Sequence, residues 1–170
     1  AIVTGGSRGI GEMITAGFLA NGVKVYISAR KAPALIEKAK ELSEKYEQEC
    51  IPIPCDLSTE EGINDFHQYI VEKEDGIDFL INNAGAAWGE PFENFSENGW
   101  NKVMDLNVKS VFFLTQKFKS LLLKRASLDD PSRIINIGSI DGLNVPAFET
   151  YSYSTSKAAV HHLTRVLAAK

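Results

Sequence analysis

Tyr153 and Lys157 lie four residues apart in the stretch "YSYSTSK", which spans residues 151–157. In an α-helix this spacing places both side chains on one face, about 6 Å apart along the axis. A tyrosine hydroxyl ordinarily keeps its proton at neutral pH, because its pKa is about 10, but a nearby ammonium favours the phenolate. Lys157 would therefore enable Tyr153 to exchange protons at neutral pH. Tyr151 has no lysine four residues further on, so Tyr153 is the stronger candidate.

Two more polar residues stand where they could join this pair. Ser139 directly follows the apolar run "RIINIG" (133–138), so we expect it at the carboxyl end of a strand, with its hydroxyl free to hold a substrate oxygen. Asn107 lies among apolar positions of a long helical stretch, and a buried amide needs partners. It would either order a water that relays protons past Lys157 or satisfy a backbone carbonyl in the core. Tyr153 would then give a proton to a carbonyl oxygen.

Short apolar runs alternate with helical patterns along the chain, and these elements must position the four residues. Strands are predicted at 1–4, 23–29, 50–55, 77–82 and 133–138, and several of them are apolar nearly throughout, which is typical of strands buried on both faces. Helices are predicted at 10–21, from Pro33, from Ser58, at 96–126 and from Tyr151 onward. This alternation predicts an α/β fold: a doubly wound parallel sheet (Rossmann fold) in three α/β/α layers. Ligands of such sheets bind beyond the carboxyl ends of the strands.

The helices carry more detailed signals. Ser58 and Glu61 have the spacing of a capping box at the start of the third helix. Gly22, after Asn21, predicts the end of the first helix. The apolar positions expected to be buried are Leu35, Ile36, Ala39, Leu42 and Tyr46 in the second helix, Ile63, Phe66 and Ile70 in the third, and Trp100, Val103, Asn107, Val111, Leu114, Phe118 and Leu122 in the long stretch.

A glycine-rich loop, "TGGSRGIG" (4–11), connects the first strand to the first helix. Gly5 would allow a sharp turn, Gly9 a close approach to a pyrophosphate, and Gly11 close packing of helix on strand. The helix N-terminus offers free N–H groups to phosphates. Although the spacing differs from G-x-G-x-x-G and a plain tight turn remains the alternative, its position after the first strand favours dinucleotide binding. The candidate contacts in this loop are Gly5, Ser7, Arg8, Gly9, Ile10 and Gly11.

Charge after the second strand indicates which dinucleotide would bind. A site for NAD would show an acidic residue there, but the sequence reads "SARK", with Arg30 and Lys31. A guanidinium can bind a 2′-phosphate with paired hydrogen bonds, and Arg8 adds a second cation. The pattern therefore favours NADPH/NADP⁺ over NAD, the alternative being that Arg30 and Lys31 form a solvated helix start.

Two further loops contribute candidate cofactor contacts. Asp56 and Leu57 follow the third strand, where they could meet the adenine. "NNAG" (82–85) follows the fourth strand and supplies Asn83, Ala84 and Gly85, although asparagines there could instead tie adjacent strands together. Tyr153 and Lys157 complete the candidate cofactor set.

Composition limits the classes of function. The chain has 170 residues, 44% of them hydrophobic and 24% charged, as in one soluble globular domain with a core. A net charge of −4 argues against nucleic-acid or membrane-surface partners, and no apolar run is long enough to cross a bilayer. Cys50 and Cys55 are expected as free thiols in the cytoplasm, and no metal site is expected from the scattered Cys and His residues. The chain begins inside a strand and ends inside a helix, so we expect a single domain, 1–170, truncated at both ends, and targeting to an organelle is not excluded.

Together, "TGGSRGIG", "NNAG", "LNV" around Asn107, Ser139 and "YSTSK" resemble the short-chain dehydrogenase/reductase family over nearly the whole chain. The resemblance implies a seven-stranded sheet in the full-length protein, NAD(P) chemistry on alcohols and ketones, and homodimers or homotetramers. It also implies that Asn107, Ser139, Tyr153 and Lys157 form the catalytic tetrad. "SARKA", "NNAGAAWGEPFE" and "RIINIGSIDG" are more closely similar to the NADPH-dependent 3-oxoacyl-[acyl-carrier-protein] reductases of the rhamnolipid-pathway type, which implies a role in fatty acid metabolism. Members of the family usually continue for another segment that forms the last strands and covers the substrate.

The resulting prediction is a reductase that transfers hydride from NADPH to a ketone, with a 3-oxoacyl thioester as substrate. The alternatives are a carbonyl or alcohol dehydrogenase of the same family with another substrate, and a non-catalytic NADP-binding protein. The presence of both Tyr153 and Lys157 argues against the latter. Trp88, Phe92 and Phe148 could line a pocket for an acyl chain, but we favour a core position for them.

Overall fold

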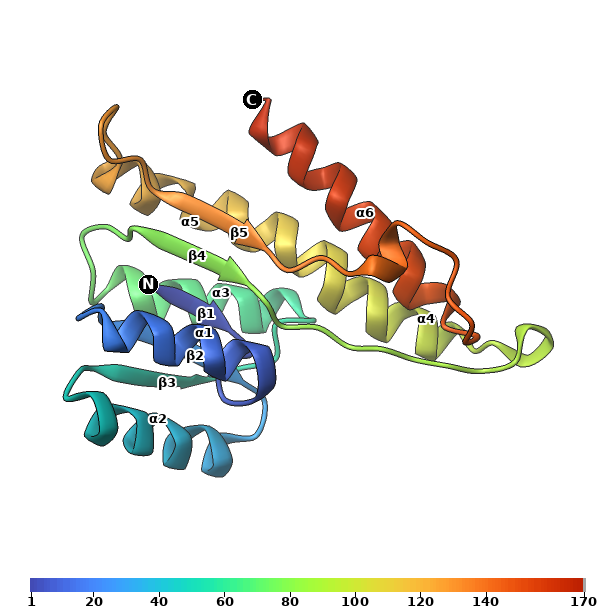
Figure 1. Cartoon of the computed structure of the whole chain (residues 1–170), viewed down its shortest axis with the longest axis horizontal. Helices are drawn as coiled ribbons and strands as arrows, with labels where there is room; N and C mark the ends of the chain where they lie inside the picture. Colours follow the sequence, from blue (N-terminus) through green and yellow to red (C-terminus); the bar gives the residue numbers. More distant parts are fainter. Residues whose placement is uncertain (170) are drawn as a thin grey trace.

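The structure, a computed structural model, describes residues 1–169 of the chain and has a central parallel sheet with helices on both faces (Figure 1). The strand order is β3-β2-β1-β4-β5. The strands are β1 (Ile2–Thr4), β2 (Val25–Ala29), β3 (Cys50–Pro54), β4 (Phe79–Asn82) and β5 (Arg133–Asn136). The α-helices are α1 (Gly9–Ala20), α2 (Ala32–Tyr46), α3 (Glu60–Val71), α4 (Glu97–Met104), α5 (Ser110–Arg125) and α6 (Tyr151–Ala168). The predicted doubly wound fold is confirmed.

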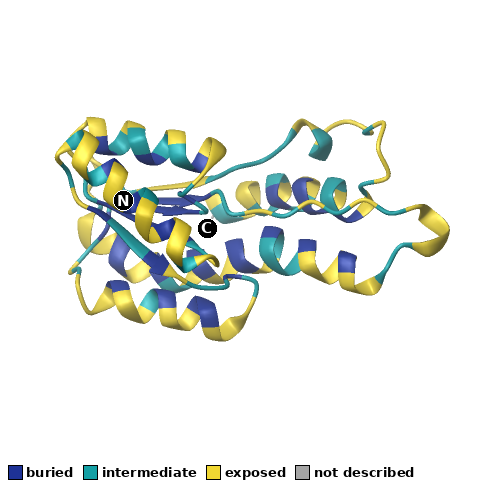
Figure 2. Ribbon diagram, turned by 90° about the horizontal axis from the view of Figure 1, so that it is seen from below, coloured by how far each residue is buried: buried dark blue, intermediate teal, exposed yellow. Residues whose placement is uncertain are grey.

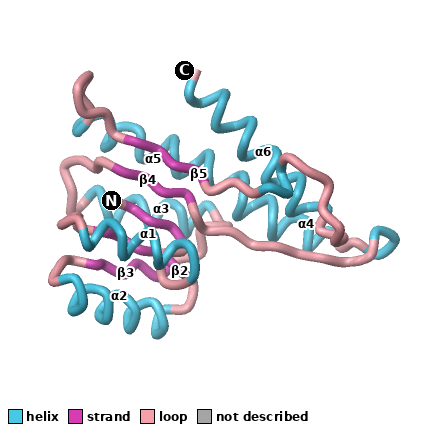
Figure 3. The backbone as a smooth tube through the Cα atoms, viewed as in Figure 1, coloured by secondary structure: helices cyan, strands magenta, loops and turns pink. Residues whose placement is uncertain are grey.

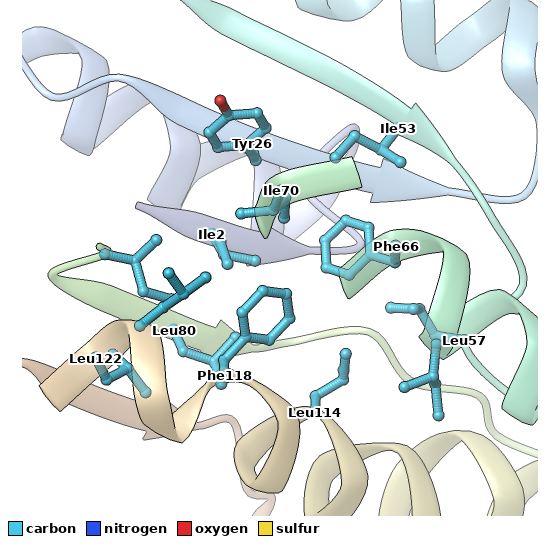
Figure 4. Close-up of a cluster of buried hydrophobic side chains, with 13 residues drawn as sticks. Ile2, Tyr26, Ile53, Leu57, Phe66, Ile70, Leu80, Leu114, Phe118 and Leu122 are labelled. Atoms are coloured by element: carbon cyan, nitrogen blue, oxygen red, sulfur yellow. The ribbon is translucent and has the colours of Figure 1, made fainter. Parts of the chain in front are cut away.

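Alternate residues of the inner strands face opposite sides of the sheet and define two cores. Ile2, Tyr26 and Leu80 belong to a core completed by α3 and α5, which Figure 4 shows in close-up. Their neighbours Val3 and Ile27 belong to a second core, completed by α1 and α2. Because both faces of a parallel strand need apolar cover, helices must pack on each side, which produces three layers. Figure 2 shows that buried residues concentrate in the strands and in the sheet-facing sides of the helices.

β5 differs from the inner strands. It pairs with β4 and forms one edge of the sheet, and Ile134 and Ile135 are 40% and 43% exposed. The expectation that several of the strands are buried on both faces is confirmed for β1, β2 and β4, and β5 is not one of them. Edge position alone does not explain this exposure, because β3 is also an edge strand and buries Cys50 and Ile53.

Three local predictions are corrected by the structure. The third helix is capped by Thr59, whose hydroxyl accepts a hydrogen bond from the backbone N–H of Gly62, and not by a Ser58–Glu61 capping box. Ser58 instead donates both its N–H and its O–H to the carboxylate of Asp56. Ile36 and Trp100, which were expected to be buried, are 52% and 38% exposed.

The long helical stretch is interrupted where Asn107 lies. A π-helical turn, η2 (Asp105–Lys109), separates α4 from α5. Such turns add one residue to the helix and are frequent at functional sites. α6 packs against α4, against η2 and against a short 3-10 turn, η3 (Ile140–Gly142), that follows β5. Figure 3 shows α4 and the first turns of α6 beyond the carboxyl ends of the strands. In the described residues, no helix has the length and hydrophobicity required to span a membrane.

Candidate active site

The glycine-rich loop between β1 and α1 adopts conformations that only glycine tolerates easily. Gly5 and Gly9 have φ angles of +65° and +56°. A Cβ at Gly11 would lie 2.9 Å from the carbonyl carbon of Gly5 and closer still to its oxygen. The hydroxyl of Thr15 lies 2.8 Å from the carbonyl oxygen of Gly11 and 3.3 Å from that of Gly6, and so ties helix to loop. Thr15 was not among the residues predicted from the sequence.

A cavity of about 260 Å³ opens beyond the carboxyl ends of β1 to β4. Eleven of the predicted cofactor contacts line it: Gly5, Ser7, Arg8, Ile10, Gly11, Arg30, Asp56, Leu57, Asn83, Ala84 and Gly85. Gly9, Lys31, Tyr153 and Lys157 do not line it, whereas Ser28, Ala29, Cys55 and Leu106, which were not predicted, do. Ser28, Ala29 and Cys55 could have been found from their place at the ends of the second and third predicted strands.

The cavity carries both cationic and polar groups. Arg8 and Arg30 are exposed at its wall. Burial by itself would raise the pKa of Asp56, but the two hydrogen bonds from Ser58 and the charge of Arg30 hold it below its usual value. The hydroxyl oxygen of Ser28 is buried without a hydrogen-bond partner, which is unusual for a buried polar atom. The cavity thus presents two guanidinium groups, an ionised carboxylate and an unpaired hydroxyl to a ligand.

The "NNAG" segment holds the sheet together with its asparagine side chains. Asn82 donates to the side chain of Asn136 at 2.8 Å, across the β4–β5 pair. The amide of Asn83 donates to the carbonyl of Thr4 at 2.8 Å, while the hydroxyl of Thr4 accepts from the N–H groups of Asn83 and Ala84 at 2.9 Å each. The interpretation that these asparagines tie adjacent strands together is confirmed. Asn83 can therefore contribute only part of its polar surface to a ligand.

Asn107 is buried in η2, and its amide is bound to protein groups. Its oxygen accepts from the N–H of Ala86 at 2.8 Å, and its nitrogen donates to the carbonyl of Ala86 and to the hydroxyl of Ser156, each at 2.9 Å. Two roles were considered for Asn107 from the sequence, and the hydrogen bonds with the backbone of Ala86 agree with the one in which its side chain satisfies backbone groups. Water ordering by its side chain stays a prediction.

Lys157 links α6 to the end of β5. Its ammonium donates to the carbonyl of Ile137 at 2.7 Å and lies 5.7 Å from the centre of the Tyr153 ring. Burial lowers the pKa of Lys157 from its usual value. Ser139 begins η3, where its oxygen accepts from the N–H of Asp141 at 3.2 Å, so its own proton is free to donate. Within residues 1–169, no hydrogen bond joins the Tyr153 hydroxyl to Ser139 or Lys157.

The preference for core positions of three aromatic residues is wrong for two of them. Phe92 and Phe148 are 70% and 80% exposed, and Trp88 is half-buried beside the Lys102 ammonium, 4.4 Å from its ring centre. Phe92 lines one surface cavity of about 530 Å³ with Tyr151, and Phe148 lines another of about 440 Å³. Both aromatics are therefore accessible to a ligand.

The parallel sheet and the glycine-rich cavity at its carboxyl edge are those of a dinucleotide-binding domain. A model of the short chain dehydrogenase family matches residues 1–170, and the chain belongs to this family. It is 46% identical to the rhamnolipids biosynthesis 3-oxoacyl-[acyl-carrier-protein] reductase of Pseudomonas aeruginosa over 168 residues, which cover 99% of this chain and 65% of the relative. It is 38% identical to the dehydrogenase/reductase SDR family member 11 of Gallus gallus, covering 98% of this chain and 66% of that one.

Two solved structures are similar to the whole sheet and its helices. The Pseudomonas aeruginosa RhlG/NADP active-site complex matches with a TM-score of 0.93 and 47% identity, covering 98% of this chain and 64% of that chain. The L-sorbose reductase of Gluconobacter frateurii, complexed with NADPH and L-sorbose, matches with a TM-score of 0.91 and 27% identity, covering 99% and 62%. The predicted family is confirmed, and the chain spans slightly less than two thirds of the length of the relatives it matches first.

Proposed function

We propose that the protein is an NADPH-dependent reductase that converts a ketone to an alcohol, with a 3-oxoacyl thioester as its substrate. The observation that carries the proposal is the cavity, which combines the glycine-rich loop with Arg8 and Arg30 at the carboxyl edge of the sheet. The name of the 46% identical Pseudomonas aeruginosa relative, a 3-oxoacyl-[acyl-carrier-protein] reductase, supports the choice of substrate.

The residues present fit an NADP cofactor. The first N–H groups of α1 have no side-chain cap, so they are free to bind a pyrophosphate. Arg8 and Arg30 supply the paired donors that a 2′-phosphate requires, and the buried hydroxyl of Ser28 supplies a donor that lacks a partner in the protein. Gly9 and Lys31 stay predicted contacts near this site.

The chain's own residues would then control the proton and the substrate. When bound, the nicotinamide supplies the hydride. Ser139 would donate its free proton to the ketone oxygen, and Tyr153 would transfer its hydroxyl proton to that same oxygen as the alcohol forms. The ammonium of Lys157, close to the Tyr153 ring, would stabilise the phenolate left behind. Asn107 would hold the loop after β4 against α6.

A carbonyl or alcohol dehydrogenase with another substrate is the second candidate. The similarity to an L-sorbose reductase favours this candidate, because that protein has a similar fold and its structure contains a polar sugar, L-sorbose. The exposed Phe92 and Phe148 favour the acyl substrate instead, since an acyl chain needs apolar contacts.

The cellular setting belongs to the same proposal. Free thiols at Cys50 and Cys55 are consistent with a cytoplasmic enzyme. Phe112 and Phe113 on α5 and Val166 on α6 are partly exposed, and covering them would favour a homodimer or homotetramer. Sedimentation of the full-length protein tests this assembly, and a monomer would contradict it.

The experiment that tests the function compares the full-length wild type with Tyr153→Phe. Wild type should consume NADPH with a short 3-oxoacyl thioester, and more slowly with a ketose. Tyr153→Phe should lose turnover by at least about a hundredfold, because proton transfer is lost, while its affinity for NADPH stays within about twofold. Turnover that survives the substitution would refute the role of Tyr153, and equal rates with both substrates would favour the second candidate.

A further inference from the structure

Ser156 is a fully buried residue of α6 whose hydroxyl is hydrogen-bonded on both sides. It is 0% exposed. Its oxygen accepts from the amide of Asn107 at 2.9 Å, and its proton is donated to the backbone carbonyl of Tyr153 at 2.7 Å. A hydroxyl has a single proton to donate, so these two contacts give it one defined orientation.

The hydrogen bonds of Ser156 are part of a chain of contacts that continues through Asn107 to the loop after β4. Asn107 uses its remaining amide groups on the N–H and the carbonyl of Ala86, in the loop after β4. The path Ala86–Asn107–Ser156–Tyr153 therefore joins this loop, the π-helical turn η2 and the first turns of α6. Gly85, which lines the cofactor cavity, directly precedes Ala86. The hydroxyl of Ser156 thus connects the backbone of Tyr153, through Asn107 and Ala86, to the wall of the cavity.

The same helix contains a matched residue that lacks this role. Ser152, one turn before Ser156, is also 0% exposed, but its hydroxyl has no hydrogen-bond partner. Burial of a serine in α6 is therefore not what distinguishes Ser156. The distinguishing feature is its pair of contacts with Asn107 and Tyr153.

We propose that Ser156 is a positioning residue that fixes Tyr153 relative to the cofactor cavity through Asn107. The inference rests on the proposed function, because it assigns Tyr153 the proton transfer. Ser156 would not touch substrate or cofactor. Its removal should leave one N–H of the Asn107 amide without an acceptor while the two hydrogen bonds to Ala86 remain, so the amide would be held less firmly. The Ala86 loop and the start of α6 could then shift, and small shifts of a reacting group reduce turnover strongly.

The test uses the full-length protein with Ser156→Ala, and Ser152→Ala as the matched control. We expect Ser156→Ala to lower kcat about tenfold while KM for NADPH stays within about twofold, and Ser152→Ala to keep wild-type kcat. Hydrogen–deuterium exchange supplies a readout independent of turnover: the amide of Ala86 should exchange faster in Ser156→Ala only, because its acceptor is Asn107.

A double-mutant cycle with Asn107→Ala tests the path itself. If Ser156 acts through Asn107, the double variant should be no slower than the slower single variant, whereas independent effects would multiply. Ser156→Thr and Ser156→Val add the same bulk but differ in the hydroxyl, so Thr should retain more kcat than Val even if both are less stable.

The outcomes separate this inference from the proposed function. A wild type without NADPH-dependent turnover would overturn both. An active wild type with unchanged kcat and Ala86 exchange in Ser156→Ala, or with multiplying effects in the cycle, would overturn the positioning role alone. Equal losses in Ser156→Ala and Ser152→Ala would mean that packing, and not the hydroxyl, is what matters.

Discussion

Gly11 offers the most direct test of how the glycine-rich loop works. A methyl group there would lie 2.9 Å from the carbonyl carbon of Gly5, whereas ordinary contacts begin at 3.4 Å. The oxygen of Gly5 would be closer still, so the loop or the helix must move by about 1 Å, and overpacking of this kind costs about 2 kcal/mol. In the full-length protein, Gly11→Ala should lower Tm by about 4–8 °C.

The same displacement should weaken the binding of the cofactor. Gly5 and Gly11 both line the cavity, so moving the loop changes the N–H groups that would bind phosphate. A loss of about 2 kcal/mol corresponds to about a thirtyfold increase in Kd for NADPH. Titration calorimetry and thermal unfolding measure the two effects separately.

Gly17 provides the matched control, because it lies on the same helix with nothing within 4 Å of an added Cβ. Gly17→Ala should raise stability by about 0.5–1 kcal/mol through helix propensity and leave NADPH affinity unchanged. If Gly11→Ala were as stable as wild type and bound NADPH equally well, the explanation that glycine is needed here for the close approach of helix to loop would be refuted.

Three further predictions concern charge and capping. Arg30→Ala should weaken NADPH binding at least about tenfold but NADH less than about threefold, as measured by fluorescence titration, and equal losses would remove the 2′-phosphate interpretation. Because burial lowers the pKa of Lys157, its charged form destabilises the folded state below that pKa, and this cost fades as pH rises toward the usual value of 10.5. The difference in Tm between Lys157→Met and wild type should therefore shrink from neutral pH to about pH 10, and a constant difference would contradict it. Thr59→Ala should cost about 1 kcal/mol in urea unfolding and Glu61→Ala less than about 0.5 kcal/mol, with the reverse order pointing back to the capping box.

The fold was predictable because two independent periodicities alternate along the chain. Inner strands such as β1 and β4 are apolar on both faces, and the helices between them repeat their apolar positions every three or four residues. The exposure of β5 was not predictable from "RIINIG", because burial of a strand depends on what lies beside it and not on its own composition.

The prediction of the cap of the third helix was wrong, because two neighbouring residues can both take this role. Ser58 and Thr59 both precede the third helix, and either hydroxyl can cap it. Asp56 decides the outcome, because its carboxylate binds Ser58 and leaves Thr59 to cap. A short-range pattern contains the candidates but does not contain this third partner.

In the candidate site, too, some residues could be predicted from the sequence and others could not. The loop residues that line the cavity follow strand ends, so the order of elements was sufficient to find most of them. The partners of Asn107 were not predictable, since Ala86 and Ser156 are 21 and 49 residues away in the chain. They meet at Asn107 in the π-helical turn, and a rare turn of this kind is difficult to recognise in a single sequence.

The two cysteines have a practical consequence for spectroscopy. Burial raises the pKa of Cys50 to about 11 and that of Cys55 to about 12, and only a thiolate reacts readily with maleimide dyes. Both native thiols should therefore react more slowly at neutral pH than an exposed cysteine, and Cys50 is also buried. A fluorophore can then be attached to a cysteine introduced at an exposed position such as Phe92 or Phe148, without first removing the native ones.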